Sequence, residues 1–178
     1  MKIVLVPEKV LHKKAKPVTD FGPKLAKTVK NMQKTLLACV DPVGVGLAAP
    51  QVGLSLRLFL MKPTPESPIQ VFVNPQILST KTEKFHKKSA QKTEDEGEPL
   101  EGCLSIPRIW GAVTRAISVT LRWDDIHGVS HEGTFSGFEA AIVQHEVDHL
   151  NGILFTHRLA EQRATIYEER NKKLHELL

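Results

Sequence analysis

Apolar residues recur at three- and four-residue steps along the segment 20–39. The repeating positions are Phe21, Leu25, Val29, Met32 and Leu36. At about 100° per residue, this spacing places them on one face of an α-helix. Asp20 suits an N-cap and Pro23 suits the first turn. We therefore predict a scaffold helix from Asp20 to about Cys39.

Shorter apolar runs predict strands in the middle of the chain. Leu56 to Met61 and Gln70 to Asn74 are rich in Leu, Val and Phe. From 117 to 123 apolar and polar residues alternate, which is typical of a half-buried strand. Residues 124–128 predict a turn before a further, shorter strand. Residues 41–53 contain two prolines and three glycines, which indicates a shaped loop.

A second helix is predicted to begin near Ser136, where Ser136 and Glu139 fit a capping box. Asn151 and Gly152 provide its end. Two apolar stripes run along this helix. One contains Phe138, Ala141 and Ile142, and the other contains Ala140, Val143, Val147 and Leu150. A helix that is apolar on two sides belongs at the centre of the fold.

The chain ends in a segment dense in Glu, Arg, Lys and Leu, which predicts a C-terminal helix over about 160–178. In that helix Ile166, Leu174 and Leu178 would dock on the body of the protein. Four basic side chains would stay in solvent, and they are Arg163, Arg170, Lys172 and Lys173. The hydrophilic segment 81–98 predicts a mobile charged loop.

Composition narrows the class of protein. A chain of 178 residues suits one compact domain. Its net charge of +4 is too small to argue for sequence-specific nucleic-acid recognition. Cys39 and Cys103 need not pair in a domain of this size, and both fit a reducing compartment. We find neither a signal peptide nor a membrane-spanning segment, so we expect a cytoplasmic protein without membrane contact.

His145, Glu146 and His149 form an HExxH pattern on the predicted central helix. Four residues return to nearly the same helix face, so both imidazoles can reach one metal ion, with Glu146 placed to move a proton. A catalytic site usually needs a third protein ligand. In the longer pattern HExxHxxGxxH that ligand is a histidine, but Phe155 stands there.

Two sources of the third ligand remain open at this point. Cys103 would bind a first-row divalent ion strongly as a thiolate. Alternatively His157, Glu161 or another downstream carboxylate would complete the site of an HExxH metalloprotease.

Three segments in this order resemble the motifs of bacterial-type peptide deformylases. They are GVGLAAPQ at 44–51, EGCLSIP at 101–107 and QHEVDHLNG at 144–152. The resemblance implies an α+β fold, with antiparallel β-sheets around a central metal-bearing helix, an N-terminal helix and a C-terminal helix. Residues 1–178 would form one catalytic domain. The metal would be held by Cys103, His145 and His149, with Glu146 as general acid and base.

The resemblance also assigns the remaining site residues. The side-chain amide of Gln51 and the backbone N–H of Leu104 would stabilise the oxyanion. Gly44 and Gly46 would let the loop backbone approach the substrate. The side-chain pocket for methionine would be lined by Val45, Phe138 and Ile142. Arg115 and Asp148 would form a charged pair that braces the site.

The activity implied is hydrolysis of the formyl group from the N-terminal formylmethionine of newly synthesised proteins, with release of formate. The cofactor would be one divalent metal ion, Fe(II) in the cell, while Zn(II), Ni(II) or Co(II) fit the same ligands. The C-terminal helix would be available for ribosome contact. A non-catalytic, deformylase-like module is the alternative. One departure concerns the rim of the site, because Trp110 stands where many relatives have Arg.

Overall fold

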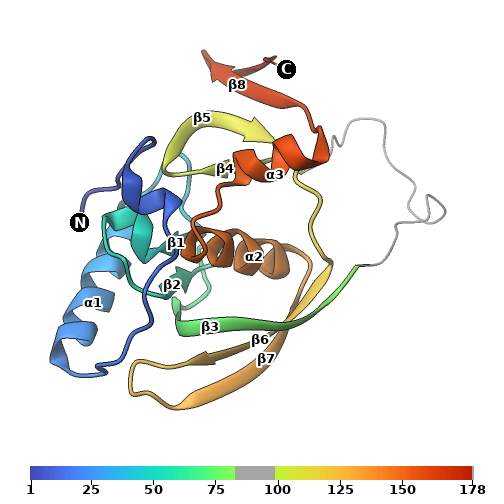
Figure 1. Ribbon diagram of the computed structural model, residues 1–178. Coiled ribbons are helices and arrows are strands. Elements are labelled where there is room, and N and C mark those ends of the chain that lie inside the picture. The colour runs from blue at the N-terminus through green and yellow to red at the C-terminus, as the bar shows by residue number, and fades with distance from the viewer. Residues whose placement is uncertain (83–98, 178) are drawn as a thin grey trace.

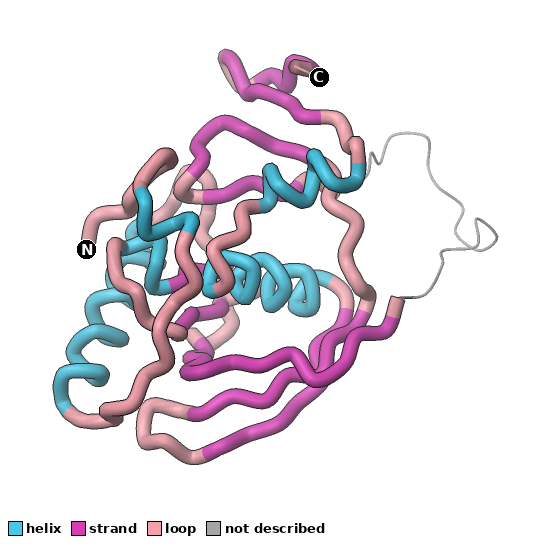
Figure 2. The backbone as a smooth tube through the Cα atoms, in the orientation of Figure 1, coloured by secondary structure: helices cyan, strands magenta, loops and turns pink. Residues whose placement is uncertain are grey.

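The computed structural model describes residues 1–82 and 99–177, and it is an α+β structure of two antiparallel sheets with helix α2 (Phe138–Leu150) between them (Figure 1). The predicted fold class is thereby confirmed. Most of the charged segment 81–98 lies outside the described residues. The tube view shows the two groups of strands on opposite sides of the central helix (Figure 2).

The larger sheet has the strand order β1-β2-β3-β6-β7, and the smaller has the order β4-β5-β8-β9. The strands of the larger sheet are β1 (Gly46–Ala48), β2 (Leu58–Met61), β3 (Gln70–Lys81), β6 (Ser118–Asp124) and β7 (Ser130–Ser136). Those of the smaller are β4 (Glu101–Cys103), β5 (Ile106–Gly111), β8 (Ile166–Arg170) and β9 (Lys173–Glu176). The helices are η1 (Lys9–His12), α1 (Pro23–Ala38), η2 (Ala49–Val52) and α3 (Phe155–Gln162), besides α2.

The larger sheet is buried on both faces at β2 and β3. Phe59 stacks on Phe72 with ring centroids 4.5 Å apart, and both belong to the core beneath α2. Leu58, Leu60 and Val73 point the opposite way, into the core beneath α1. Because side chains alternate across a strand, the run Leu-Phe-Leu-Met supplies both cores. This explains why β2 has no polar position.

Helix α1 buries the predicted apolar face, but its N-cap is Gly22 rather than Asp20. The carboxylate of Asp20 accepts the N–H of Gly22 at 2.9 Å and so shapes the turn that precedes the helix. The strand predictions are confirmed with shifted ends, except that β7 is as long as β6 and not shorter. β3 continues past the predicted end at Asn74 to Lys81, through register irregularities that accommodate Pro75.

The predicted capping box of α2 is wrong, because Gly137 is the N-cap and no side chain caps the helix. Ser136 is instead the last residue of β7 and pairs with Ser118 of β6. Gly137 has a φ of +59°, which lets the chain turn from the strand into the helix within one residue. The predicted helix end is confirmed, with Asn151 as the C-cap.

The prediction of a C-terminal helix over 160–178 is wrong. Helix α3 spans Phe155–Gln162 and ends at Arg163 in the left-handed conformation, and β8 and β9 follow as a hairpin. Asn171 and Lys172 both have positive φ, as a two-residue hairpin turn requires. β8 pairs with the edge of β5, so sheet hydrogen bonds override the helix propensity of these residues.

The docking of the C-terminal segment also differs from the expectation. Ile166 packs against the core formed by η1, β4, β5 and α3, as predicted. Leu174 is exposed, which contradicts its predicted docking, and Leu178 lies outside the described residues. Cys39 and Cys103 are both free thiols. Within residues 1–82 and 99–177, none of the helices has the length and hydropathy that crossing a bilayer would require.

Candidate metal centre

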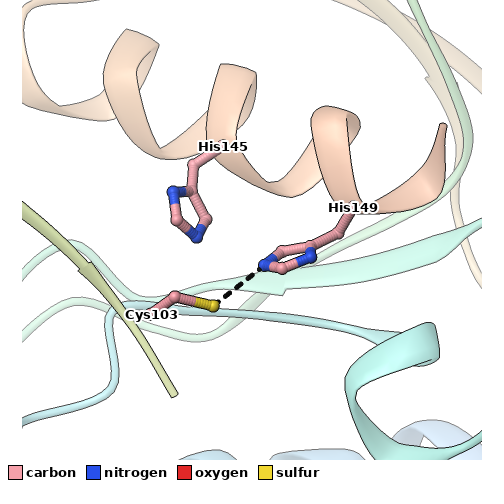
Figure 3. Close-up of side chains that lie close together, drawn as sticks. All are labelled: Cys103, His145 and His149. Carbon is pink, nitrogen blue, oxygen red and sulfur yellow. Dashed lines mark hydrogen bonds between the residues drawn. The ribbon is translucent and has the colours of Figure 1, made fainter. Parts of the chain in front are cut away.

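A thiol and two imidazoles converge where the end of β4 meets α2 (Figure 3). Cys103 is the last residue of β4, and His145 and His149 lie one turn apart on α2. The Sγ of Cys103 lies 3.2 Å from Nε2 of His149, and the candidate ligand atoms of all three residues lie within 4.8 Å of one another. Among the described residues, no other group of this kind is found.

The geometry and the chemistry of these atoms fit a bound divalent ion. Ligands at about 2.0–2.3 Å from a tetrahedral ion lie roughly 3.5 Å from each other, which is close to the sulfur–nitrogen distance observed. Burial opposes ionisation of the Cys103 thiol. The charge of His149 and the hydrogen bonds from both histidines outweigh burial, so the pKa of Cys103 lies well below its ordinary value. A thiolate is the form that binds metal.

The competing third ligands do not reach this cluster. Phe155 is 1% exposed and packs in the core beside the ring of His145. His157 accepts the backbone N–H of Leu154 through Nδ1, at 3.1 Å. The side chain of Glu161 is 61% exposed and pairs with Arg158. The geometry therefore favours Cys103 over the arrangement of an HExxH metalloprotease.

A carboxylate fixes the orientation of His145. Oε2 of Glu101 lies 3.1 Å from Nδ1 of His145, which leaves Nε2 of the ring for the cluster. Burial alone would raise the pKa of Glu101. The hydrogen bonds from Arg115 and His145 have the larger, opposite effect and lower the pKa to about 2. Glu101 is therefore an anion that holds the imidazole in one tautomer.

Arg115 joins Glu101 to the helix that carries the histidines. Its guanidinium donates to both oxygens of Glu101 at 2.8 and 2.9 Å, and to Asp148 at 2.6 Å. Asp148 also accepts two hydrogen bonds from Arg158 of α3. The predicted pair of Arg115 and Asp148 is present, as part of a larger network. Sequence reasoning did not assign Glu101 or Arg158 to it, although Glu101 lies within a recognised motif.

Glu146 is buried beside the cluster. Its side chain is 3% exposed, and Oε2 has no hydrogen-bond partner within the described part of the chain. Burial raises the pKa of this carboxyl to about 7. The carboxylate lies against Gly46, where any side chain would overlap Oε1, so the glycine makes room for it. A group with this pKa can both accept and release a proton near neutral pH.

The amide of Gln51 is held in one orientation. Its Oε1 accepts the backbone N–H of Ala48 at 2.8 Å, and its Nε2 donates to Sγ of Cys103 at 3.4 Å. Because the oxygen is occupied by a donor, the NH₂ group must face the thiol. The side chain is 1% exposed. Gln51 thus places a fixed N–H donor beside the candidate ligands.

An open pocket of about 240 Å³ lies over the cluster. All five predicted pocket residues line it, and they are Gly44, Val45, Gly46, Phe138 and Ile142. Gln51, Leu104 and Glu146 line it as well, with two of the three candidate ligands, Cys103 and His145. Trp110, expected at the rim, lines the pocket too. Leu100 and Ala141 also contribute, and neither was expected there from the sequence. The chemical groups are therefore accessible to a ligand.

Known proteins resemble the chain along most of its length. A sequence model of the polypeptide deformylase family matches residues 1–165. A peptide deformylase of Christiangramia forsetii is 35% identical, over 94% of this chain and 86% of that protein. The crystal structure of a Thermotoga maritima peptide deformylase superposes with a TM-score of 0.73 at 35% identity, covering 88% of this chain and 95% of that one.

A Legionella pneumophila peptide deformylase structure gives a TM-score of 0.74 at 39% identity, covering 89% of this chain and 85% of that one. These likenesses in sequence and in fold agree with the three motifs and with the cluster beneath the pocket. The chain belongs to the polypeptide deformylase family.

Proposed function

We propose that this protein hydrolyses the formyl group from the N-terminal formylmethionine of newly synthesised proteins and releases formate. The observation that carries the proposal is the buried thiol–imidazole cluster at the floor of an open pocket, with Glu146 beside it. Cys103, His145 and His149 would hold one divalent cation. When bound, that cation supplies Lewis acidity, which polarises a carbonyl and makes water a nucleophile near neutral pH.

Glu146 acts as the general base and then as the general acid. Its raised pKa of about 7 lets it take a proton from the attacking water and give it to the leaving amine. The unpartnered Oε2 atom is free to make this contact. Gly46 keeps the carboxylate in place, because a larger residue would displace it.

Gln51 and the backbone N–H of Leu104 stabilise the negative charge that develops on the formyl oxygen. The Gln51 amide is already oriented by Ala48, so little reorganisation is needed when charge appears. Its second N–H is available after the first has bonded to Cys103. Leu104 follows Cys103 directly and lines the pocket, so its backbone is close to the same region.

The apolar walls of the pocket take up the methionine side chain. Ile142 is 4% exposed and forms the deep part, while Phe138 is 60% exposed and forms the rim. Val45, between Gly44 and Gly46, completes the wall on the opposite loop. An unbranched thioether fits an irregular apolar pocket of this kind because it adapts its shape easily.

We propose Fe(II) as the metal in the cell, with Zn(II), Ni(II) or Co(II) able to occupy the same ligands. One thiolate and two imidazoles accept all four ions, so availability decides between them. A ferrous ion beside a thiolate is sensitive to oxidation. Newly made formylated chains are the substrate, so the cytoplasm is the place where we expect the enzyme to act.

We also propose contact with the ribosome. The residues on which this proposal depends differ from those expected, because the C-terminal segment has a different structure. The expected C-terminal helix is a hairpin, in which Arg170, Lys172 and Lys173 are balanced by Glu168, Glu169 and Glu176. The proposal then rests on Lys172 and Lys173 at the turn and on Arg163. Unchanged co-sedimentation with ribosomes after Lys172→Glu and Lys173→Glu together would count against it.

The test of the proposed activity is release of formate from formyl-Met-Ala-Ser by anaerobically purified protein. We expect turnover that stops after chelation and returns when Fe(II) is added back. Acetyl-Met-Ala-Ser is the matched substrate, and it should remain intact. Binding of the formyl peptide without any formate would instead indicate a non-catalytic, deformylase-like module.

A further inference from the structure

The side chain of Trp110 connects the C-terminal hairpin to the pocket. Trp110 is on β5 and lines the pocket above the cluster. Its indole Nε1–H donates to Oε2 of Glu169, on β8, at 3.1 Å. The family match ends at residue 165, so Glu169 and the whole hairpin lie beyond it. A segment outside the matched region therefore touches a wall of the pocket.

The positions of neighbouring strands explain why the indole is held in one place. Trp110 is paired with Gly102 of β4 on one side and with Tyr167 of β8 on the other. A Cβ atom on Gly102 would lie 2.8 Å from the indole, so the ring covers this glycine closely. Glu169 is two residues from Tyr167 and hence on the same face of the sheet. The ring is fixed by packing on one strand and by a hydrogen bond to another.

The mouth of the pocket that Trp110 lines carries apolar side chains. Val43 and Phe138 line the pocket and are 65% and 60% exposed, so they lie where it opens to solvent. Leu100 lines the same pocket. With its N–H engaged by Glu169, the indole offers only carbon surface to a ligand. When the first residue of a peptide is bound at the floor of the pocket, the residues that follow it must cross this apolar mouth.

We infer that Glu169 positions Trp110 so that the pair selects substrates with an apolar side chain directly after the formylmethionine. The inference rests on the proposed function, because it concerns the peptide bound at that site. Glu169 acts through Trp110 and has no contact with the reacting atoms. The hairpin is in this way a specificity element as well as an extension of the smaller sheet.

The experiment compares formyl-Met-Phe-Ser with formyl-Met-Asp-Ser through the ratio of their kcat/KM values. We expect the wild-type protein to favour the Phe peptide, and Trp110→Ala to reduce the ratio roughly tenfold, mainly through KM. Glu169→Ala should reduce the ratio in the same direction. Glu169→Gln should restore it, because the amide oxygen still accepts the indole N–H.

Glu168→Ala is the matched control, since it removes a carboxylate from the same strand that pairs with Arg170 rather than with Trp110. Its ratio should equal that of the wild type. The inference is overturned if the wild-type protein shows no preference, or if Glu169→Ala slows both peptides equally, as a purely structural role would.

The Kd values of both peptides are measured in parallel on Glu146→Gln protein. The same preference should appear in binding. If no peptide yields formate while the Kd ratio persists and falls in the Glu169→Ala background, the proposed activity fails and the specificity role stands. Equal Kd values for the two peptides would overturn the specificity role whatever the activity.

Discussion

The floor and the rim of the pocket differ in how deeply their side chains are buried and in the contacts that hold them. At the floor, Cys103, Glu146 and Gln51 are 6%, 3% and 1% exposed, and the residues beside them are joined by charged hydrogen bonds. At the rim, Val43 and Phe138 are more than half exposed, and Trp110 is held by packing over Gly102 and by one hydrogen bond. A change at the floor should stop the chemistry, and a change at the rim should alter which peptide is bound.

The largest effect is expected for Glu146→Gln. Glutamine keeps the size of the side chain and cannot carry the proton, so kcat should fall by about 10²–10⁴-fold while the metal content is unchanged. Formate release and metal analysis on the same sample measure both. Glu139→Gln, on the same helix and outside the pocket lining, should retain full activity. Near-normal turnover by Glu146→Gln would remove Glu146 from the proton transfer.

Replacing Gln51 should produce the next largest loss. Gln51→Ala removes one oriented N–H donor, and kcat should fall by about 10²–10³-fold with a smaller change in KM. The matched control is Gln162→Ala, since that amide binds the backbone of Thr114 away from the pocket. If Gln51→Ala raised KM and left kcat intact, the amide would bind the substrate without stabilising the transition state.

Replacing two arginines, one at a time, compares the buried network with an ordinary surface ion pair. Arg115→Ala leaves Glu101 and Asp148 without their shared partner in a site where the Arg115 side chain is only 10% exposed. The free energy of unfolding should fall by about 3–5 kcal/mol, and metal affinity should weaken about 10- to 100-fold. Urea denaturation and metal titration measure these two quantities.

Arg122→Ala provides the contrast to Arg115→Ala. Arg122 pairs with Glu132 on the larger sheet, and both side chains are more than half exposed. This change should cost about 0–1 kcal/mol and leave metal affinity as it was. Equal losses for the two variants would show that the buried network does not brace the site.

The smallest effect is expected at the rim. Phe138→Ala removes an exposed ring from the start of α2, so KM should rise roughly tenfold at most while kcat stays the same. Val129→Ala, an exposed apolar residue at the turn between β6 and β7, is the control for surface changes. A fall in kcat for Phe138→Ala would place this side chain in the chemistry rather than in binding.

Local periodicity predicted the central features of the fold. The spacing in α1 and α2 and the alternation in β6 each reflect a face that is buried in the structure. The helix prediction for the C-terminal segment is wrong, because Glu, Lys, Arg and Leu favour a helix only when no strand partner is present. The edge of β5 supplies that partner, and the local sequence does not predict pairing with a strand that is distant along the chain.

In the site, too, local sequence predicts some features, while others depend on contacts between residues that are distant along the chain. The HExxH pattern places two imidazoles on one helix face without any tertiary knowledge. Cys103 as a partner came from the resemblance, since 42 residues separate it from His145 and spacing alone could not bring them together. The role of Glu101 toward His145 and the contact between Trp110 and Glu169 depend on sheet register, which only the structure reveals.

X-ray absorption at the metal edge of anaerobically purified protein tests the central claim most directly. Cys103, His145 and His149 are predicted to give one sulfur at about 2.3 Å and two imidazole nitrogens at about 2.0–2.1 Å. The sulfur signal should vanish in Cys103→Ser protein. A shell of nitrogen and oxygen alone in the wild-type protein would contradict the proposal that Cys103 completes the site.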